Sequence, residues 1–328
     1  NKFRTCGLLS VGLLLLVRLA RRSQHSGLFA VEIHVGHGYL ISSFLSQAVN
    51  KRTDHYGGSS ENRARLLVEI IEAVRLEVGP KFPILVRLDA KEYRIENGIV
   101  LDDFLVTAKL AEDAGADALD VSAYGNTNKG IAFTEAPLVH EPGGFIPFAR
   151  IAKKTVSIPI IAVGRIELQE AEKGLSAGDF DFVAMGRKLL ADPDLPNKIS
   201  TGDTQLVRPC IYCYICVSQI FINQPMTCAV NARLGKEYMN ENIIYSTAQQ
   251  KNILIIGAGP SGMEAARLLG EQGHKVQIWD REKDIGGTVS VAALAYETND
   301  RLIVYLKHLT LIHLPEPPRP YQKSNAGF

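Results

Sequence analysis

The sequence predicts an α/β fold that joins part of a parallel (β/α)8 TIM barrel to the start of a Rossmann-type dinucleotide-binding domain. Short apolar segments alternate with amphipathic segments from residue 27 to residue 200. This alternation favours a parallel sheet with helical crossovers. No nucleotide fingerprint interrupts these strands, which favours a barrel over a doubly wound sheet. A glycine-rich turn after residue 252 then opens the second domain.

The barrel elements follow one another in a regular order. We expect strands over 30–34, 83–89, 118–124, 159–165 and 182–190. We expect the intervening helices over 62–78, 101–115, 148–156 and 168–178. Residues at the carboxyl ends of barrel strands face the active site. The residues at or near these ends are His34, Arg87, Ser122, Gly164, Arg165, Gly186 and Arg187.

Composition narrows the functional class. The chain has 328 residues, enough for about two domains, and 46% of them are hydrophobic. The formal net charge is +1 and no basic stripe stands out, so we expect no nucleic-acid partner. Four of the five cysteines lie between residues 210 and 228. That crowding indicates a ligand cluster in a reducing, cytoplasmic compartment and not a secreted disulfide framework.

The two ends of the chain lack a barrel or nucleotide-binding pattern. Residues 1–26 combine a basic start with an apolar run of about 11 residues, too short to span a membrane. We expect an aberrant N-terminus and assign it no element. Residues 301–328 contain a proline-rich run, and we expect them to be disordered. Only five barrel strands are visible, so we interpret the chain as an internal piece of a longer protein.

Residues 31–40, VEIHVGHGYL, contain three titratable side chains in one short run. His34, His37 and Tyr39 follow an apolar strand and precede a polar loop. Considered alone, the run is either a strand end that happens to contain histidine or part of a catalytic site. The position at the end of a barrel strand favours the catalytic interpretation.

The cysteines form a C-x2-C-x2-C-x11-C pattern within residues 201–247, which we expect to be a cluster segment and linker. Two tight spacings and a fourth thiol nearby suit either a [4Fe–4S] cluster or zinc. Spacing alone leaves both open. The candidate ligands are Cys210, Cys213, Cys216 and Cys228.

Residues 248–300 carry the pattern of a truncated dinucleotide-binding domain. Gly257, Gly259 and Gly262 form G-x-G-x-x-G between an apolar strand and an amphipathic helix, and Asp280 ends the next strand. Glycine permits the tight turn, the helix N-terminus meets a pyrophosphate, and the acid can bond a ribose hydroxyl.

Residues 27–200 resemble the old yellow enzyme family of flavin oxidoreductases. The resemblance rests on VEIHVGHGYLISSFLSQAVNKRTDHYGGSSENRARL, IPIIAVGRI and DFVAMGRKLLADPDLPNK. It implies FMN across the barrel mouth, with Arg87 toward the N1/O2 edge of the flavin. It also implies a phosphate site formed by Gly164, Arg165, Gly186 and Arg187.

The resemblance also implies roles for the residues of the VEIHVGHGYL run. His34 and His37 would hold the carbonyl oxygen of an α,β-unsaturated substrate, and Tyr39 would donate the proton. The expected substrates are enoates, enones such as 3-oxo-Δ4 steroids, or dienoyl thioesters, reduced with NAD(P)H. The alternatives are an amine dehydrogenase that passes electrons to an electron-transfer flavoprotein, or an inactive fragment.

Iron–sulfur members of this group, such as 2,4-dienoyl-CoA reductase and trimethylamine dehydrogenase, resemble the chain beyond the barrel. The resemblance therefore favours a [4Fe–4S] cluster at the cysteines and FAD, or ADP in the amine dehydrogenase, at the glycine-rich turn. The x2 spacing between the second and third cysteines is closer to the amine dehydrogenase form.

Overall fold

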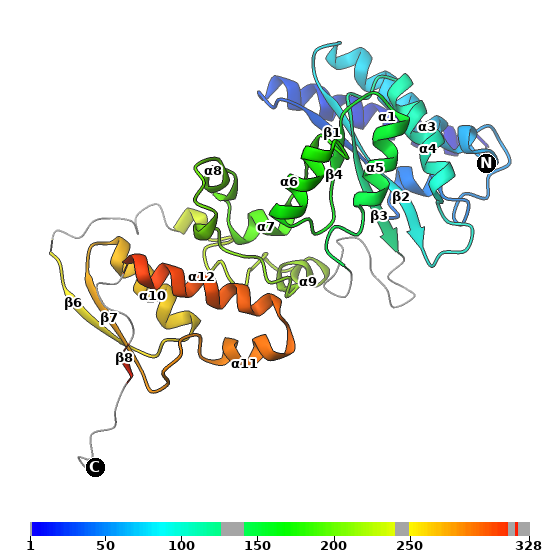
Figure 1. The fold of residues 1–328 in the computed structure, drawn as a ribbon. Helices are drawn as coiled ribbons and strands as arrows, with labels where there is room; N and C mark the ends of the chain where they lie inside the picture. Colours follow the sequence, from blue (N-terminus) through cyan, green and yellow to red (C-terminus); the bar gives the residue numbers. More distant parts are fainter. Residues whose placement is uncertain (1, 126–140, 240–248, 314–318, 321–328) are drawn as a thin grey trace, which may run out of the picture. The chain divides into compact units, whose positions relative to one another are not determined.

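The computed structural model describes residues 2–125, 141–239, 249–313 and 319–320. The chain divides into two compact units, residues 1–185 and residues 186–328, which we call the first and second units (Figure 1). Each has its own core, and each is described by itself. The boundary falls before residue 200, where the sequence predicted the end of the barrel segment.

The first unit contains a five-stranded parallel sheet whose strands pair in chain order. The strands are β1 (Val31–Val35), β2 (Ile84–Tyr93), β3 (Ala118–Gly125), β4 (Ile160–Ala162) and β5 (Phe182–Val183). Consecutive parallel pairing requires a crossover between each strand and the next, and helices supply these crossovers. The predicted parallel α/β sheet is therefore confirmed.

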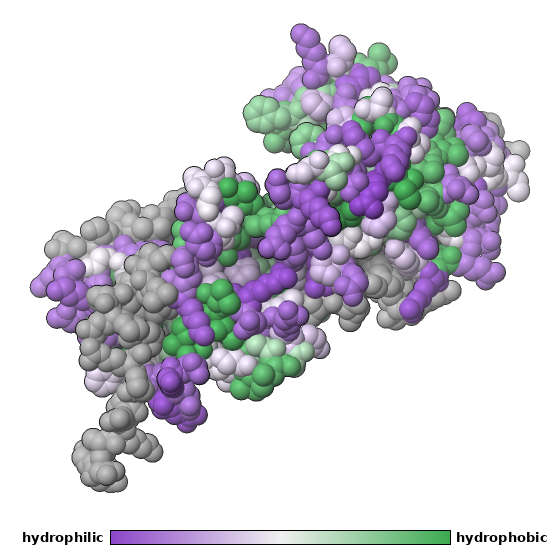
Figure 2. Space-filling view, in the orientation of Figure 1, coloured by the Kyte–Doolittle hydropathy of each residue, from purple (hydrophilic) through white to green (hydrophobic). Residues whose placement is uncertain are grey.

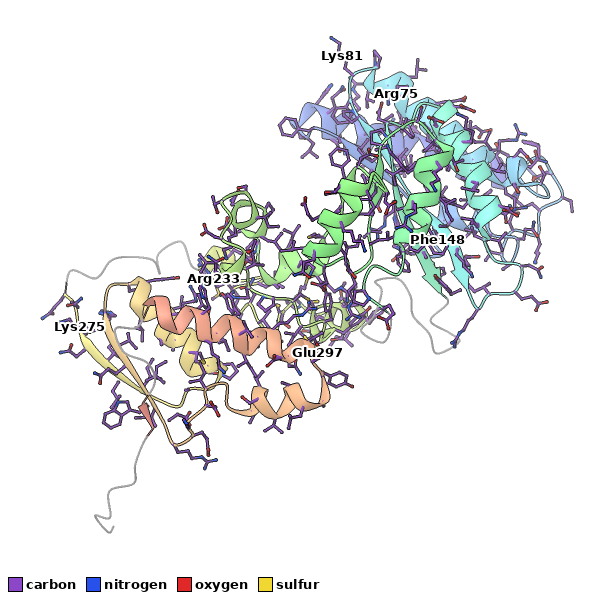
Figure 3. All side chains as sticks on the ribbon, viewed as in Figure 1. Arg75, Lys81, Phe148, Arg233, Lys275 and Glu297 are labelled. Carbon is purple, nitrogen blue, oxygen red and sulfur yellow. The ribbon has the colours of Figure 1, made fainter. Side chains whose placement is uncertain are left out.

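The helices of the first unit follow the order of the strands they connect. Contacts join α1 to α3, α3 to α4 and α4 to α5, as in a segment of barrel wall. The helices are α1 (Lys2–His25), α2 (Leu40–Leu45), α3 (Ser60–Val78), α4 (Leu101–Asp113), α5 (Ile146–Thr155) and α6 (Leu168–Ala177). Phe148 of α5, labelled in Figure 3, packs against the core.

Local sequence signals explain α3. The Ser59 side chain accepts a hydrogen bond from the Asn62 N–H and caps the helix, and Gly79 ends it with φ of 78°. Leu67 and Ile71 lie four residues apart, on the same side of the helix, and are almost completely buried. Burying each such side chain contributes about 1.5–3 kcal/mol to folding.

Arg75, labelled in Figure 3, ties the end of α3 to the loops that precede the next strands. Its guanidinium donates to the carbonyl oxygens of Gly79, Phe82 and Gly115. The loops before β2 and β3 lie at the amino-terminal ends of the strands. This end of the sheet is therefore fixed by structural bonds, which leaves the opposite end for function.

Residues 2–25 form α1, although the sequence assigned them no element. Leu13, Leu16, Val17 and Ala20 pack against the core of the first unit. The apolar run thus supplies one face of a packed helix. Among the described residues, no helix combines the length and apolarity needed to cross a membrane.

The second unit contains a parallel three-stranded sheet in the order β6-β7-β8. Met263 and Ala266 of its α10 are buried with Val276 and Ile278 of β7. The strands are β6 (Asn252–Ile256), β7 (Lys275–Asp280) and β8 (Arg319–Pro320). The helices are α7 (Gly186–Ala191), α8 (Leu195–Ser200), α9 (Ile215–Phe221), α10 (Pro260–Glu271), α11 (Thr288–Ala295) and α12 (Thr298–His313).

Two expectations about individual elements need correction. The expected strand 182–190 ends at Val183, and residues 186–191 form α7, because the run through Leu189, Leu190 and Ala191 favours helix. The expected disorder over 301–328 is wrong for its first part, which belongs to α12. Residues 314–318 and 321–328 lie outside the described residues.

The packing of α12 explains this second correction. Leu302, Tyr305, Leu306 and Leu309 recur at helical spacing and are buried in the core of the second unit. Burial of this apolar face against α10 stabilises a helix that the neighbouring prolines obscure in the sequence.

Candidate active site and cofactor positions

The structure brings His34, His37 and Tyr39 together at the carboxyl end of β1. His34 lies on the strand, His37 in the following turn, and Tyr39 immediately before α2. The ring centroids of His34 and His37 are 4.9 Å apart, and those of His34 and Tyr39 are 5.5 Å apart. Tyr39 is 65% exposed, whereas the His37 side chain is 11% exposed. The tyrosine can therefore meet a ligand that arrives from solvent.

The turn that carries His37 has an unusual backbone. His37 has φ of 62° and Gly38 has φ of 72°, both in the left-handed region. The His37 N–H donates to Asp89 Oδ2 at 2.5 Å, and His37 Nε2 lies 2.9 Å from Ser122 Oγ. A Cβ at Gly38 would lie 2.8 Å from the hydroxyl oxygen of Tyr124, so a side chain there would displace the Tyr124 ring, and the left-handed backbone also favours glycine.

Polar side chains from β2 and β3 extend this cluster. Arg87 pairs in register with His34 on one side and with Asp120 on the other, and Asp89 pairs with Ser122. Alternate residues of a strand share a face, so these side chains gather on one side of the sheet. Sequence reasoning did not single out Asp89, Asp120 or Tyr124. The available signal was their two-residue spacing from Arg87 and Ser122.

The geometry of Arg87 suits a flavin. Its Nε lies 3.6 Å from Asp120 Oδ2 and, among the described residues, has no hydrogen-bond partner. The Arg87 side chain is 24% exposed. A fixed, partly exposed cation fits the electron-rich N1/O2 edge of FMN.

Burial sets the protonation of the cluster. It lowers the pKa of His37 to about 3, with Arg87 and His34 acting in the same direction. The pKa of His34 is also lowered, by burial and then by Arg87. Both imidazoles are therefore neutral at physiological pH, and each retains one N–H donor. Burial raises the pKa of Asp89 to about 7, against the opposing hydrogen bond from His37 and the charge of Arg87.

Serine, histidine and aspartate meet here without forming a nucleophilic triad. Ser122 Oγ is 2.9 Å and Asp89 Oδ1 is 3.7 Å from the same nitrogen, His37 Nε2. In a Ser-His-Asp triad, the serine and the aspartate contact opposite ring nitrogens. The arrangement therefore does not support acyl transfer.

The residues predicted to hold the flavin phosphate fall in both units. In the first unit, Gly164 (φ 108°) and Arg165 (φ 54°) form the turn after β4. A Cβ at Gly164 would lie 2.6 Å from the Phe145 ring, so the close approach requires glycine. In the second unit, Gly186 and Arg187 begin α7. Left-handed backbone and arginine in the first of these turns fit an anion.

The Arg187 guanidinium carbon lies 5.1 Å from the ring centroids of both Tyr212 and Tyr214, within the second unit. These tyrosines flank Cys213. Arg187, which the sequence predicts to bind the flavin phosphate, therefore stacks on the loop that carries this cysteine. At 5.1 Å from each ring, this contact is a pair of cation–π interactions.

The four cysteines of the second unit are free thiols. Cys216 is buried and Cys213 is exposed, with Cys210 and Cys228 intermediate. Burial raises the pKa of Cys210 and of Cys216, and proximity to Cys228 adds to both shifts. Within the described parts of the chain, however, no three His, Cys, Asp or Glu side chains are grouped closely enough to hold a metal ion. The donor chemistry fits a cluster, and its assembly stays a prediction.

The glycine-rich turn between β6 and α10 has the form that a pyrophosphate needs. Gly257 has φ of 110°, and a Cβ at Gly262 would lie 2.0 Å from the Gly257 carbonyl oxygen. Asp280, at the end of β7, accepts a hydrogen bond from the Ala258 N–H at 2.6 Å. The acid therefore lies beside the turn, where a bound ribose would be expected.

Comparison with known proteins identifies the family. Residues 16–205 match the NADH:flavin oxidoreductase / NADH oxidase family. The chain belongs to this family. Residues 255–309 match an NAD(P)-binding Rossmann-like domain. The predicted resemblance and the two fold classes, TIM-barrel-type and Rossmann-type, are confirmed.

Individual relatives of this family are similar to the chain over most of its length. A metal reductase of Desulforamulus reducens is 38% identical over 281 residues, which are 84% of this chain and 41% of the relative. A cinnamate reductase of Clostridium sporogenes is 34% identical over 304 residues, 87% of this chain and 45% of the relative.

A solved structure of a reductase is also similar to the chain over most of its length. A 2-naphthoyl-CoA reductase in complex with 2-naphthoyl-CoA has a TM-score of 0.88 and 34% identity, over 93% of this chain and 46% of that chain. The chain thus spans less than half the length of these proteins.

Proposed function

We propose that the chain carries part of a flavin-dependent active site that reduces the C=C bond of α,β-unsaturated carbonyl compounds with NAD(P)H. The observation that carries the proposal is the cluster of His34, His37 and Tyr39 beside Arg87 at the carboxyl end of the sheet. The similarity to proteins named cinnamate reductase and 2-naphthoyl-CoA reductase supports this substrate class.

The FMN-binding residues in this proposal are Arg87, Gly164, Arg165, Gly186 and Arg187. Bound FMN supplies a hydride for the substrate β-carbon. Arg87 contributes a positive charge beside the flavin edge that becomes anionic on reduction. The glycine turns contribute backbone N–H groups toward the phosphate.

His34 and His37 act on the substrate carbonyl. As hydride reaches the β-carbon, negative charge develops on the carbonyl oxygen, and two neutral imidazole N–H groups stabilise it as an oxyanion hole does. The low pKa values of both histidines keep these donors neutral. Tyr39 then donates its phenolic proton to the α-carbon as a general acid.

The second unit extends the proposal to two more cofactors. We propose a [4Fe–4S] cluster at Cys210, Cys213, Cys216 and Cys228, which would carry single electrons. We propose FAD, or ADP, at the turn of Gly257, Gly259 and Gly262, with Asp280 toward the ribose. The C-x2-C-x2-C-x11-C spacing of the four thiols and the left-handed Gly257 support these assignments.

A two-way flavin experiment tests the function. The full chain is loaded with FMN, reduced anaerobically, and mixed with an enoate, an enone or an enoyl thioester. Reoxidation of the flavin absorbance by one of these supports the proposal. In the converse experiment, oxidised FMN on the chain is mixed with a tertiary amine.

Flavin reduction by the amine, without reoxidation by any unsaturated carbonyl, would favour the amine dehydrogenase alternative with an electron-transfer flavoprotein as acceptor. Bound FMN that responds to neither class would overturn both.

A further inference from the structure

Asp89 lies directly beneath the turn that carries His37. The residue is 2% exposed and belongs to β2, where it pairs in register with Ser122 of β3. Its Oδ2 accepts the His37 N–H at 2.5 Å, and its Oδ1 lies 3.7 Å from His37 Nε2. Among the described residues, Oδ1 has no hydrogen-bond partner. The carboxyl group therefore contacts the backbone of His37 and approaches its ring.

The turn closes tightly over this carboxyl group. A Cβ at Gly36 would lie 2.9 Å from Asp89 Oδ1 and 3.2 Å from Asp89 Oδ2, so any side chain there would displace the carboxyl. The next residue, His37, has φ of 62°, which is unfavourable for a residue with a side chain. The hydrogen bond from the His37 N–H to Asp89 Oδ2 can hold this conformation.

A second strand fixes the ring itself. Ser122 Oγ lies 2.9 Å from His37 Nε2. Ser122 and Asp89 are neighbours in the ladder between β2 and β3, so their separation is set by the sheet. The backbone and the imidazole of His37 are thus held by adjacent residues on two rigid strands. The direction of the imidazole therefore does not depend on the turn alone.

We propose that Asp89 is a positioning residue for His37. By accepting the His37 N–H, the carboxyl group fixes the left-handed turn and hence the direction of the imidazole. Its catalytic consequence rests on the proposed function, in which His37 holds the substrate carbonyl oxygen. Asp89 acts through His37, so the expected defect on its removal is one of geometry.

A matched pair of substitutions separates the hydrogen bond from volume. Asp89→Asn keeps an acceptor oxygen at the same reach, whereas Asp89→Leu keeps a similar volume and removes the acceptor. In the full chain loaded with FMN, hydrogen exchange of the His37 amide is followed by 15N NMR. We expect exchange to accelerate about tenfold or more in Asp89→Leu and to stay within about threefold in Asp89→Asn.

The same variants are then tested on the reaction. Oxidation of reduced FMN by a saturating enone should slow by about 10–100-fold in Asp89→Leu, the effect of a misplaced catalytic group. Asp89→Asn should recover most of that loss. The defect should appear at saturating substrate, because the imidazole is misdirected in the transition state as well as in the bound complex.

Gly36→Ala provides an independent perturbation if Asp89→Leu does not fold. Its Cβ should displace the carboxyl group and expose the His37 amide. Gly12→Ala, with open space around its Cβ, is the control and should change neither the hydrogen exchange of His37 nor the rate of flavin oxidation. Unchanged His37 exchange in Gly36→Ala and in the folded Asp89→Leu would overturn the proposal. Altered exchange with an unchanged oxidation rate would overturn its catalytic part. Altered exchange in a chain that no unsaturated carbonyl oxidises would uphold the positioning and reject the proposed function.

Discussion

Arg87 is the residue whose charge reaches most of the candidate site. It lowers the pKa of His34 and His37 and opposes the burial that raises the pKa of Asp89 and Asp120. One partly buried cation therefore helps to keep the histidines neutral while it favours ionised acids around them. Because their pKa values are lowered, these imidazoles can donate hydrogen bonds to a carbonyl oxygen but are weak bases for the proton of Tyr39.

Tyr39→Phe tests the proposed general acid. The change keeps the ring and removes the phenolic proton, so flavin oxidation by an enone should slow by about 10²–10⁴-fold. Reduction of the flavin does not need this proton and should stay unchanged, as stopped-flow absorbance of the two half-reactions can show. Tyr238→Phe, an exposed tyrosine of the second unit, serves as the control. If Tyr124→Phe were the slow variant instead, the neighbouring phenol would be the donor.

Asp120→Asn tests the raised pKa of Asp120 through the pH dependence of stability. Burial raises the pKa of Asp120 to about 7, with Glu32 adding to the shift and Arg87 opposing it. An unfolded aspartate has a pKa near 3.9, so between pH 4 and 7 the native state holds a proton that the unfolded state releases. The free energy of unfolding of the unmodified chain therefore falls as pH rises through that window.

Asp120→Asn has no carboxyl group at this position, so its free energy of unfolding lacks this fall with rising pH. We expect its stability relative to the unmodified chain to increase by about 1–4 kcal/mol from pH 4 to pH 7. Urea unfolding followed by circular dichroism measures the difference, and the opposite contribution of His37 cancels because both chains contain it. A difference that is flat with pH would show that Asp120 is ionised in the folded state.

At the scale of secondary-structure elements, strands and helices with a local pattern were predictable. The β1 strand and α3 carry apolar spacing and end signals that act within a few residues, and His34 and His37 lie within such a segment. Asp89 and Asp120 gain their roles from the register between strands, which is a non-local property that a single strand does not encode. The helices α1 and α12 were missed because packing against α3 and α10, respectively, decides them.

Gly262→Ala tests the proposed nucleotide-binding turn. The added Cβ would lie 2.0 Å from the Gly257 carbonyl oxygen, so the close approach of α10 to the turn cannot persist. We expect ADP or FAD affinity, measured by calorimetry, to fall by about tenfold or more. Gly144→Ala in the first unit controls for the substitution itself. Unchanged nucleotide binding in Gly262→Ala would place the ligand elsewhere.

Cys228→Ser tests the proposed [4Fe–4S] cluster. After anaerobic reconstitution with iron and sulfide, the unmodified chain should show a broad absorbance that bleaches on reduction, and the variant should lose it. Cys6→Ser is the matched control, because Cys6 is the one cysteine of the sequence that lies outside residues 201–247. Stoichiometric zinc without acid-labile sulfide in the unmodified chain would replace the iron–sulfur assignment by a zinc site.

At the scale of the whole molecule, hydrogen bonds explain why the second unit begins before residue 200. The Arg208 backbone N–H donates to the side chain of Asp192, which follows α7. The Arg208 guanidinium donates to Asn231, and to Glu264 in α10. The last barrel-like segment, the cysteine segment and the Rossmann-type domain are therefore bonded into one unit. These bonds join residues 16, 23 and 56 positions apart in sequence, so a motif read along the chain does not report them.

The edges of the first sheet lead to a prediction about association. Within the described residues, β1 and β5 each pair on one side only, and unpaired strand edges are templates for association. Apolar side chains are also exposed on the molecular surface (Figure 2). We therefore expect the purified chain to associate as its concentration rises, as light scattering after size-exclusion chromatography can measure.

Two lysine substitutions separate edge pairing from general apolar contact. Phe182→Lys places a charge on the edge strand β5, where Phe182 is 58% exposed, and Leu76→Lys places one on α3, where Leu76 is 88% exposed. Charges on an edge strand oppose the approach of a second strand, so Phe182→Lys should weaken association more than Leu76→Lys. Equal effects would attribute association to apolar surface in general. A monomer at all concentrations would show that the edges are protected in the intact chain.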